Sequence, residues 1–157
     1  MSQEKQAPGY KQLRVWQKAD DLACAIVKLA RTLPNDARWL VPQVARAAIS
    51  VPANIAEGYS RGSLREYIHH LSIARGSLAE TEYYVHLISR TGLLDEAAVQ
   101  PLKPLLQQTA GLLYALIRSL AKKLEENGSR RPYVIKEDGG AYIADVEFDP
   151  DPLRSKP

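Results

Sequence analysis

The chain has 157 residues, a net charge of +3 at pH 7 and a single cysteine, so it fits one domain without an internal disulfide bond. Residues 1–9 are polar and contain a proline, unlike the apolar stretch of a secretion signal, and charged residues interrupt every apolar run before the roughly 20 residues that cross a bilayer. We therefore expect a flexible N-terminus over residues 1–9 and a cytoplasmic protein that has no membrane partner.

The first predicted helix runs from about Lys11 to Leu33. Its apolar residues recur at alternating spacings of four and three, as on one buried helix face: Val15, Ala19, Leu22, Ile26, Leu29 and Leu33. A second apolar stripe lies beside the first: Trp16, Ala23, Val27 and Ala30. Together the two stripes make an apolar face that is wider than packing on two neighbouring helices requires, which indicates a further partner. Cys24 lies in the same apolar pattern, and we expect it to be buried.

The second predicted helix ends near Tyr59 and contains two prolines. Pro42 fits a helix start or a bend, whereas Pro52 lacks the amide proton that an interior position donates, so we expect a kink there. The residues around Pro52 are small enough to let another backbone approach closely: Ala45, Ala47, Ala48, Ser50, Ala53 and Ala56.

A capping box opens the third predicted helix. Ser63 is followed three residues later by Glu66, and in this motif each side chain satisfies a free amide of the other residue. Two heptad positions carry the buried seam; they are Leu64, Leu71, Leu78 and Val85, and Tyr67, Ala74, Thr81 and Ile88. We expect this helix to end at Gly92.

The fourth predicted helix follows a short turn that Asp95 can cap. Pro101 and Pro104 fit its opening, and Gly128 its end. Its core stripe consists of Leu102, Leu106, Thr109, Leu113, Leu116 and Leu120. Four such helices predict an all-α fold, an up-down four-helix bundle over residues 10–127.

Residues 128–157 have a different character. They carry 5 Lys and Arg against 6 Asp and Glu, whereas residues 1–127 carry 16 against 12. This C-terminal tail is either disordered or forms a hairpin between 133–136 and 142–146 that turns at Asp138 and Gly139. An isolated hairpin is only marginally stable in water, so an ordered one would have to dock on the bundle or on a neighbouring subunit.

Three separated motifs resemble a known family. They are Tyr10, Leu13 and Val15–Ala19; Arg46–Ser50 followed by Val51–Tyr59; and Ile73–Glu80. In this order they resemble the bacterial four-helix bundle family first noticed as reading frames inside intervening sequences of 23S ribosomal RNA genes. The resemblance implies an up-down bundle that assembles into a ring-shaped homo-oligomer, typically a pentamer, with no known enzymatic activity. A group of similar architecture, the accessory proteins of diversity-generating retroelements, binds nucleic acid and a reverse transcriptase.

No constellation of residues indicates catalysis or metal binding. Glu66 and His69 form one Glu-x-x-His pair, but di-iron bundles use two such pairs, and the heptad phase puts His69 opposite the seam. His70 and His86 have no nucleophile and orienting carboxylate at a recognisable spacing. The chain also lacks a phosphate-binding glycine loop and a zinc-ligand spacing. We therefore expect no catalytic residue, no metal, no cofactor and no enzymatic activity.

A polar stripe on the second helix is the more informative pattern. Arg46, Ser50, Asn54 and Glu57 share one face at spacings of four, four and three. In a structural interpretation, Asn54 or Ser50 satisfies the carbonyl that Pro52 leaves unpaired on Ala48, and Glu57 pairs with Arg46 or with a neighbouring subunit. In a functional interpretation, the stripe lines the subunit interface or the ring centre and contacts a ligand.

Three small basic clusters are candidate nucleic-acid contacts. They are Lys11, Arg14 and Lys18 on the first helix, Arg61 and Arg65 around the turn before the third, and Arg118 and Lys122 on the fourth. Each cluster alone is more typical of a solvated charged face, but a ring repeats it several times and adds avidity. Tyr10 and Trp16 lie beside the first cluster, where they can stack on bases or, for Trp16, fill the second apolar stripe.

These patterns lead to two functional hypotheses. The first is a non-enzymatic, homo-oligomeric scaffold whose basic surface binds RNA or DNA. The second is an adaptor that presents its helix ends and its C-terminal tail to a protein partner, without nucleic acid. Deleting residues 128–157 separates them, because an adaptor loses its partner whereas a nucleic-acid binder keeps its affinity or gains a little as acidic charge leaves.

Overall fold

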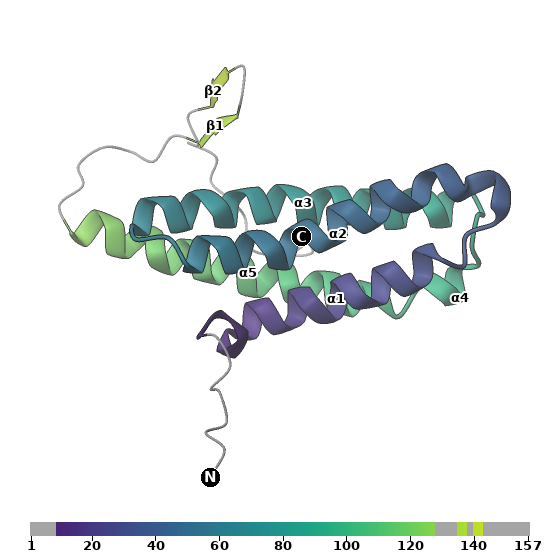
Figure 1. The fold of residues 1–157 in the computed structure, drawn as a ribbon, viewed down its shortest axis with the longest axis horizontal. Helices are drawn as coiled ribbons and strands as arrows, with labels where there is room; N and C mark the ends of the chain where they lie inside the picture. Colours follow the sequence, from purple (N-terminus) through teal and green to yellow (C-terminus); the bar gives the residue numbers. More distant parts are fainter. Residues whose placement is uncertain (1–8, 128–134, 138–139, 143–157) are drawn as a thin grey trace, which may run out of the picture.

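The computed structural model describes residues 9–127, 135–137 and 140–142, and four long α-helices make up most of it (Figure 1). The chain opens with the 3-10 helix η1 (Gly9–Gln12) and α1 (Arg14–Ala30), followed by the 3-10 helix η2 (Asn35–Leu40) and α2 (Val41–Tyr59). Next come α3 (Leu64–Arg90), the short α4 (Glu96–Val99) and α5 (Leu102–Glu126). The helical class and the four long helices predicted from the sequence are confirmed.

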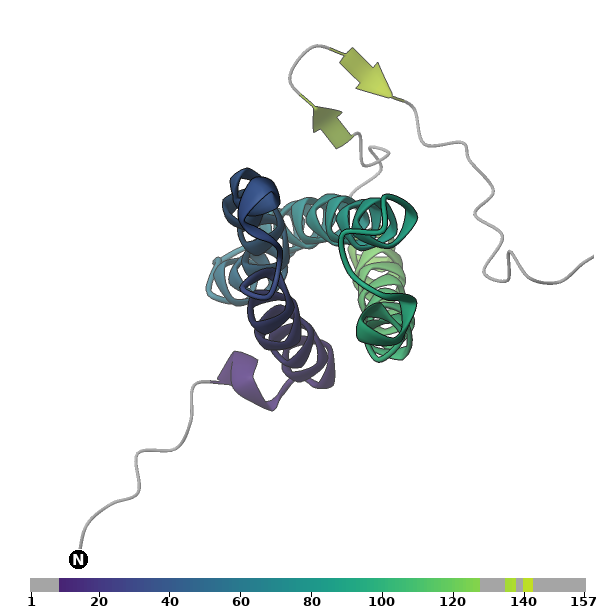
Figure 2. The same cartoon turned by 90° about the vertical axis from the view of Figure 1, so that its right-hand side faces the viewer.

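Successive long helices run in opposite directions around one core. α1 packs on α2 and α5, and α3 packs on the same two helices, so the four form a cycle when viewed end on (Figure 2). This order gathers the start of α1, the end of α2, the start of α3 and the end of α5 at one end of the bundle (Figure 1). We call it the η1 end; η2 and α4 lie at the opposite end.

The core takes apolar side chains from all four long helices. On α1 most of the predicted stripe is buried, together with Ala23 and Ala30 of the second stripe, while Trp16 and Val27 are half-buried. On α3 seven residues of the two predicted heptad positions or beside them are buried: Ile68, Leu71, Ala74, Leu78, Thr81, Val85 and Ile88. Among the described residues, no helix is both long enough and apolar enough to cross a membrane.

The helix starts follow their sequence signals with two differences. Asp95 lies at the N-cap position of α4, but its side chain makes no capping hydrogen bond within the described part of the chain. Pro42 lies in the first turn of α2, and Pro101 immediately precedes α5. Ser63 Oγ accepts a hydrogen bond from the Glu66 amide at 3.2 Å, as a capping box requires. The Glu66 carboxylate accepts a bond from the Ser63 hydroxyl at 2.8 Å, so the carboxylate bonds to the side chain of Ser63 rather than to its amide.

α2 and α3 approach each other closely near the η1 end. Pro52 is buried inside α2, and the helix continues on both sides of it. A Cβ atom added to Gly58 would lie 2.8 Å from His70 Cβ and 2.9 Å from Tyr67 Cδ2, closer than carbon atoms pack. Only glycine at position 58 allows this crossing.

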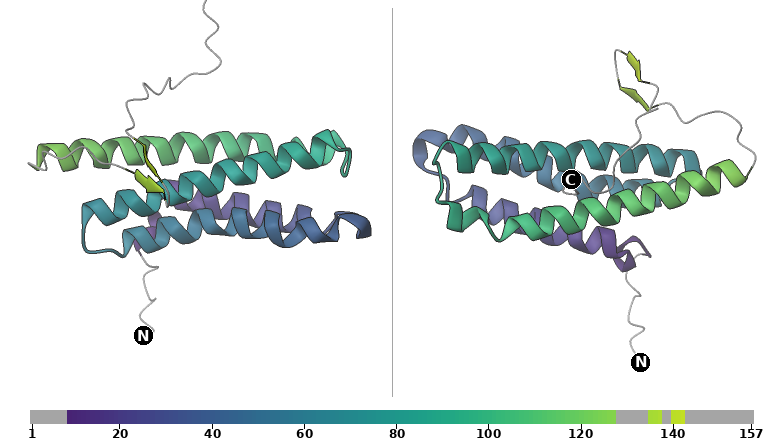
Figure 3. Two further views of the ribbon diagram at one scale, coloured as in Figure 1. Left: turned by 90° about the horizontal axis from the view of Figure 1, so that it is seen from above. Right: turned by 180° about the vertical axis from the view of Figure 1, so that it is seen from behind.

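α5 is buried along its first half only. Its buried residues are Leu102, Leu106, Thr109 and Leu113, whereas Leu116 and Leu120 of the predicted stripe are half-buried. The reason for the lower burial is that the last turns of α5 extend beyond the start of α3 (Figure 3), so the neighbouring helix does not run alongside them.

The prediction that Cys24 is buried is wrong. Its side chain is exposed and lines a groove between α1 and α2, whose other walls include Val27, Ile49 and Pro52. The apolar face of α1 is wider than the surface that α2 and α5 cover, so the outer edge of its second stripe is exposed to solvent.

In the tail, β1 (Ile135–Glu137) pairs antiparallel with β2 (Gly140–Tyr142), with Ile135 opposite Tyr142. The predicted strands overlap this pair only in part, and the predicted turn at Asp138 and Gly139 lies outside the described residues.

Candidate interaction sites

All seven candidate nucleic-acid contacts lie at the η1 end. Lys11 belongs to η1, Arg14 and Lys18 open α1, and Arg61 and Arg65 flank the turn between α2 and α3. Arg118 and Lys122 lie in the last turns of α5, which end on the same side of the bundle (Figures 1 and 3). Three clusters that are separate in the sequence therefore surround one end of the fold.

Three of the seven cations have acidic partners. Lys18 pairs with Asp21 at 3.3 Å, and Lys122 lies 3.8 Å from Glu126. The Arg61 guanidinium pairs with the Glu57 carboxylate. The other four pair with no carboxylate among the described residues; they are Lys11, Arg14, Arg65 and Arg118. All four are exposed, so their charges are available to a partner.

Aromatic side chains connect the cations of α1 with those of the α2–α3 turn. The Tyr10 and Trp16 rings meet edge to face at 5.2 Å, and Trp16 also packs on the core. η1 packs on α2, where Gly9 lies against the Tyr59 hydroxyl, and the Tyr59 ring meets Tyr67 edge to face at 6.1 Å. Tyr59 is 43% exposed, so it presents an aromatic surface beside the cations, a role that the sequence pattern did not single out.

Tyr67 has an unusual environment in this cluster. Its hydroxyl is buried and has no hydrogen-bond partner among the described residues. Burial, with a smaller contribution from the neighbouring Tyr59, raises the pKa of Tyr67 to about 12. The phenol is neutral at physiological pH, as an ordinary tyrosine is, and the raised pKa extends its neutral range to higher pH.

Part of the polar stripe of α2 forms a network with α3. Asn54 Nδ2 donates to the Ser50 carbonyl at 2.9 Å and to Ser50 Oγ at 3.0 Å, and Ser77 Oγ donates to Ser50 Oγ at 2.9 Å. The His70 ring lies between two groups of α2, with Nδ1 3.3 Å from Asn54 Oδ1 and Nε2 3.8 Å from Glu57 Oε1. The network joins the two helices across a half-buried interface.

Two pairings predicted for the stripe are wrong. Glu57 pairs with Arg61, one turn further along the chain, and Arg46 instead donates to Gln43 at 3.1 Å. Asn54 bonds to the carbonyl of Ser50 rather than to that of Ala48, because its side chain reaches back by one helical turn. Within the chain, the hydrogen-bonded residues of the stripe are therefore Ser50, Asn54 and Glu57.

Sequence reasoning missed His70 and Ser77 as members of this network. They are spaced by seven residues, and each immediately precedes a seam leucine, Leu71 or Leu78. A polar residue repeated at this heptad position faces the edge of the helix contact, so the spacing itself could have identified both.

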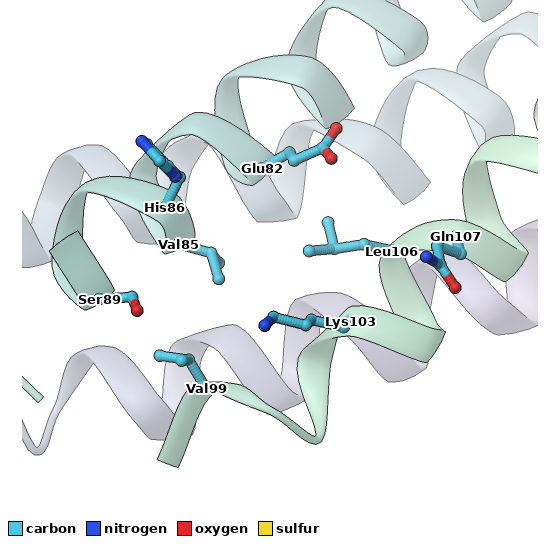
Figure 4. A pocket seen from close by; sticks show the side chains of 8 residues that line it. All are labelled: Glu82, Val85, His86, Ser89, Val99, Lys103, Leu106 and Gln107. Atoms are coloured by element: carbon cyan, nitrogen blue, oxygen red, sulfur yellow. The ribbon is translucent and has the colours of Figure 1, made fainter. Parts of the chain in front are cut away.

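A second hollow lies between α3 and α5 at the opposite half of the bundle (Figure 4). It measures about 280 Å³, and Val85 and Leu106 point toward one another across it while the His86 ring points away. Lys103 on its rim pairs with Glu96 at 2.7 Å. Within the described residues His86 bonds to neither Ser89 nor Glu82, and the Ser89 hydroxyl donates a hydrogen bond to the Glu96 carboxylate. The described residues also contain no group of three or more potential metal ligands.

Exposed apolar side chains mark two further faces. Ile49 is 51% exposed beside the α1–α2 groove that Cys24 and Val27 line. On the outer face of α3, Ile73 and Tyr83 are exposed, and a Cβ atom at Gly76 between them would meet nothing within 4 Å.

Comparison with known proteins identifies a family and a similar solved structure. A family model described as 23S rRNA-intervening sequence protein matches residues 11–115. Among solved structures, the chain is similar to a protein of unknown function from the S23 ribosomal protein family of Bacteroides thetaiotaomicron, with 28% sequence identity and a TM-score of 0.62. That similarity covers 66% of this chain and 98% of the other. No curated protein matches the chain significantly.

Proposed function

The chain belongs to the 23S rRNA-intervening sequence protein family, and from this premise we propose that it is a cytoplasmic, homo-oligomeric helical scaffold that binds RNA or DNA without catalysis of its own. The observation that carries the nucleic-acid part is the convergence of seven cations at the η1 end. Four of them have no acidic partner among the described residues, so binding a phosphate costs no existing ion pair.

The aromatic side chains support the same surface. Tyr59 is exposed beside Arg61, and the Tyr10–Trp16 pair lies beside Lys11 and Arg14. Cations that follow a phosphate backbone, combined with rings on which bases stack, are typical of sites for single-stranded nucleic acid. We therefore expect single strands and loops to bind more tightly than duplexes.

The apolar faces support self-assembly. A ring of more than two subunits joins two different faces of each protomer. We assign the α1–α2 groove with Ile49 as one face and the outer surface of α3 around Ile73 and Tyr83 as the other. A pentamer assembled in this way would repeat the η1 end five times and turn a weak contact into a tight one.

Fluorescence anisotropy with labelled single-stranded RNA, single-stranded DNA and duplex DNA tests the nucleic-acid function. Replacing Lys11, Arg14 and Arg65 by Ala should weaken binding at low salt by at least about tenfold and reduce the salt dependence, since log K falls by roughly 0.7 to 0.9 per phosphate contact. Arg38, Arg75 and Arg90 are exposed arginines away from the η1 end, and their triple Ala variant is the matched control. Equal affinity of the two variants, or no binding by wild type at low salt, would reject the function and favour the protein-binding adaptor.

Light scattering tests the assembly separately. Ile49→Glu places a charge in the proposed contact and should lower the solution mass to that of a smaller species. Gln108→Glu introduces the same charge on an exposed position of α5 and should leave the mass unchanged. A wild-type protein that is monomeric at micromolar concentration contradicts the scaffold.

A further inference from the structure

The C-terminal tail carries a segment whose charge is opposite to that of the η1 end. Residues 137–151 contain six acidic residues and no lysine or arginine. Four of the six occur at every second position, namely Asp145, Glu147, Asp149 and Asp151. In an extended chain, side chains two residues apart lie on the same side with a spacing of roughly 6.6 to 6.8 Å, so this spacing can present a row of carboxylates.

The fold brings the origin of the tail to the basic end. α5 ends at Glu126, on the same side of the bundle as η1 and the α2–α3 turn (Figure 3). From Asn127 the chain needs ten steps to reach Glu137, which span up to about 33 to 36 Å when extended. Helices in contact lie roughly 8 to 10 Å apart, so this reach exceeds the width of the bundle end.

We propose that the acidic segment 137–151 docks on the η1 end of its own bundle, where it occupies the cations that a nucleic acid would contact. The cations concerned are Lys11, Arg14, Arg65 and Arg118, which have no acidic partner among the described residues. A tether of this length holds the segment at an effective concentration in the millimolar range, so even a weak ionic contact is populated. The tail then acts as an internal competitor that only a tightly bound or multiply attached nucleic acid displaces.

The first test compares full-length variants in nucleic-acid binding. Asp145→Asn, Glu147→Gln, Asp149→Asn and Asp151→Asn together neutralise the row of carboxylates. The matched control neutralises four acids outside the η1 end: Asp36→Asn, Glu80→Gln, Glu82→Gln and Asp95→Asn. Both variants raise the net charge by the same amount, so a general effect of charge appears in both.

We expect the tail variant to bind labelled single-stranded RNA at least about fivefold more tightly than wild type at low salt, and the control to stay within about twofold. The advantage should shrink at physiological salt, because screening releases the tail from the cations. Equal gains in the two variants, or none in the tail variant, would overturn the proposal.

The second test measures docking without nucleic acid and rests on no assumption about function. A labelled synthetic peptide of residues 137–151 is titrated with the full-length tail variant, whose η1 end is vacant. Saturable, salt-sensitive binding that weakens at least about fivefold when Lys11, Arg14 and Arg65 are also changed to Ala supports docking. A peptide that binds both proteins equally, or neither, refutes it. If the peptide binds while no variant binds nucleic acid, docking stands and the proposed function fails.

Discussion

The α2–α3 interface and α5 are stabilised by different kinds of residue. α2 meets α3 through small and polar side chains, with Gly58 against Tyr67 and a hydrogen-bonded network around Asn54. α5 packs with large aliphatic residues, which are buried up to Leu113 and half-buried beyond it. A close contact tolerates little change in volume, whereas a partly covered aliphatic helix end adapts. The last turns of α5 are therefore the more tolerant part of the bundle, and they also carry Arg118 and Lys122.

The largest difference should appear along α5 itself. Leu113→Ala removes a side chain that is 1% exposed and should lower the free energy of unfolding by about 3 kcal/mol, because it leaves a cavity. Leu120→Ala removes the same atoms from a half-buried position and should cost only about 1 kcal/mol. Urea unfolding at one protein concentration measures both. Equal losses would show that the end of α5 is as well packed as its middle.

A pair of glycine variants tests the close contact. Gly58→Ala forces a methyl group against His70 and Tyr67 and should destabilise the protein by about 2 kcal/mol, although alanine favours the helix. At Gly111 of α5 a Cβ atom would meet nothing within 4 Å, so Gly111→Ala should stabilise by up to about 1 kcal/mol through helix propensity. If thermal or urea unfolding shows that both variants change the free energy of unfolding in the same direction, the comparison is contradicted.

Two buried threonines, one on α3 and one on α5, differ in the hydrogen bonding of their hydroxyl groups. The Thr81 hydroxyl on α3 donates to the Ser77 carbonyl at 2.8 Å, whereas the Thr109 hydroxyl on α5 is buried and has no partner within the part of the chain that the structure describes. Thr109→Val should therefore stabilise the protein by about 1 kcal/mol, and Thr81→Val should be neutral or destabilising by a similar amount. A loss of stability in Thr109→Val would indicate that its hydroxyl is hydrogen-bonded in solution.

The smallest effect concerns pH at the α2–α3 interface. The pKa of Tyr67 is raised to about 12 from an ordinary value of 10.0, so between these values the unfolded chain releases the proton while the folded protein retains it. The contribution is fully present below pH 10 and is lost as pH rises toward 12. Tyr67→Phe should reduce the fall in urea midpoint between pH 9 and pH 11. Identical slopes for Phe and wild type would place the phenol in solvent.

The fold class and the four helices could be predicted from the sequence because their causes are local, although α1 spans Arg14–Ala30 and is three residues shorter at each end than predicted. The alternation of apolar residues from Val15 to Leu33, the Ser63–Glu66 cap and the heptads of α3 depend on neighbours within one or two turns. The membership of Ser50 and Asn54 in a polar network followed from the same spacing. The family match confirms the predicted family, and the observed helices confirm the helical class.

Contacts between helices were predicted less well, because spacing along one helix does not fix its partner. Cys24 was expected to be buried, but the orientation of α1 in the bundle leaves this residue exposed to solvent. Glu57 was expected to pair with Arg46 or with a neighbouring subunit, and within the chain it pairs with Arg61, where the chain turns into α3. His70 and Ser77 contact polar residues of α2 because α3 packs closely against α2 at Gly58.

The sequence by itself determined that four amphipathic helices form and roughly which segments form them, since each helix depends on residues close together in the chain. Only the tertiary structure decided that three separate basic clusters share one end with Tyr59 and with the origin of the acidic tail. The physical reason is topological, because antiparallel packing brings the start of one helix beside the end of the next, whatever their distance in sequence.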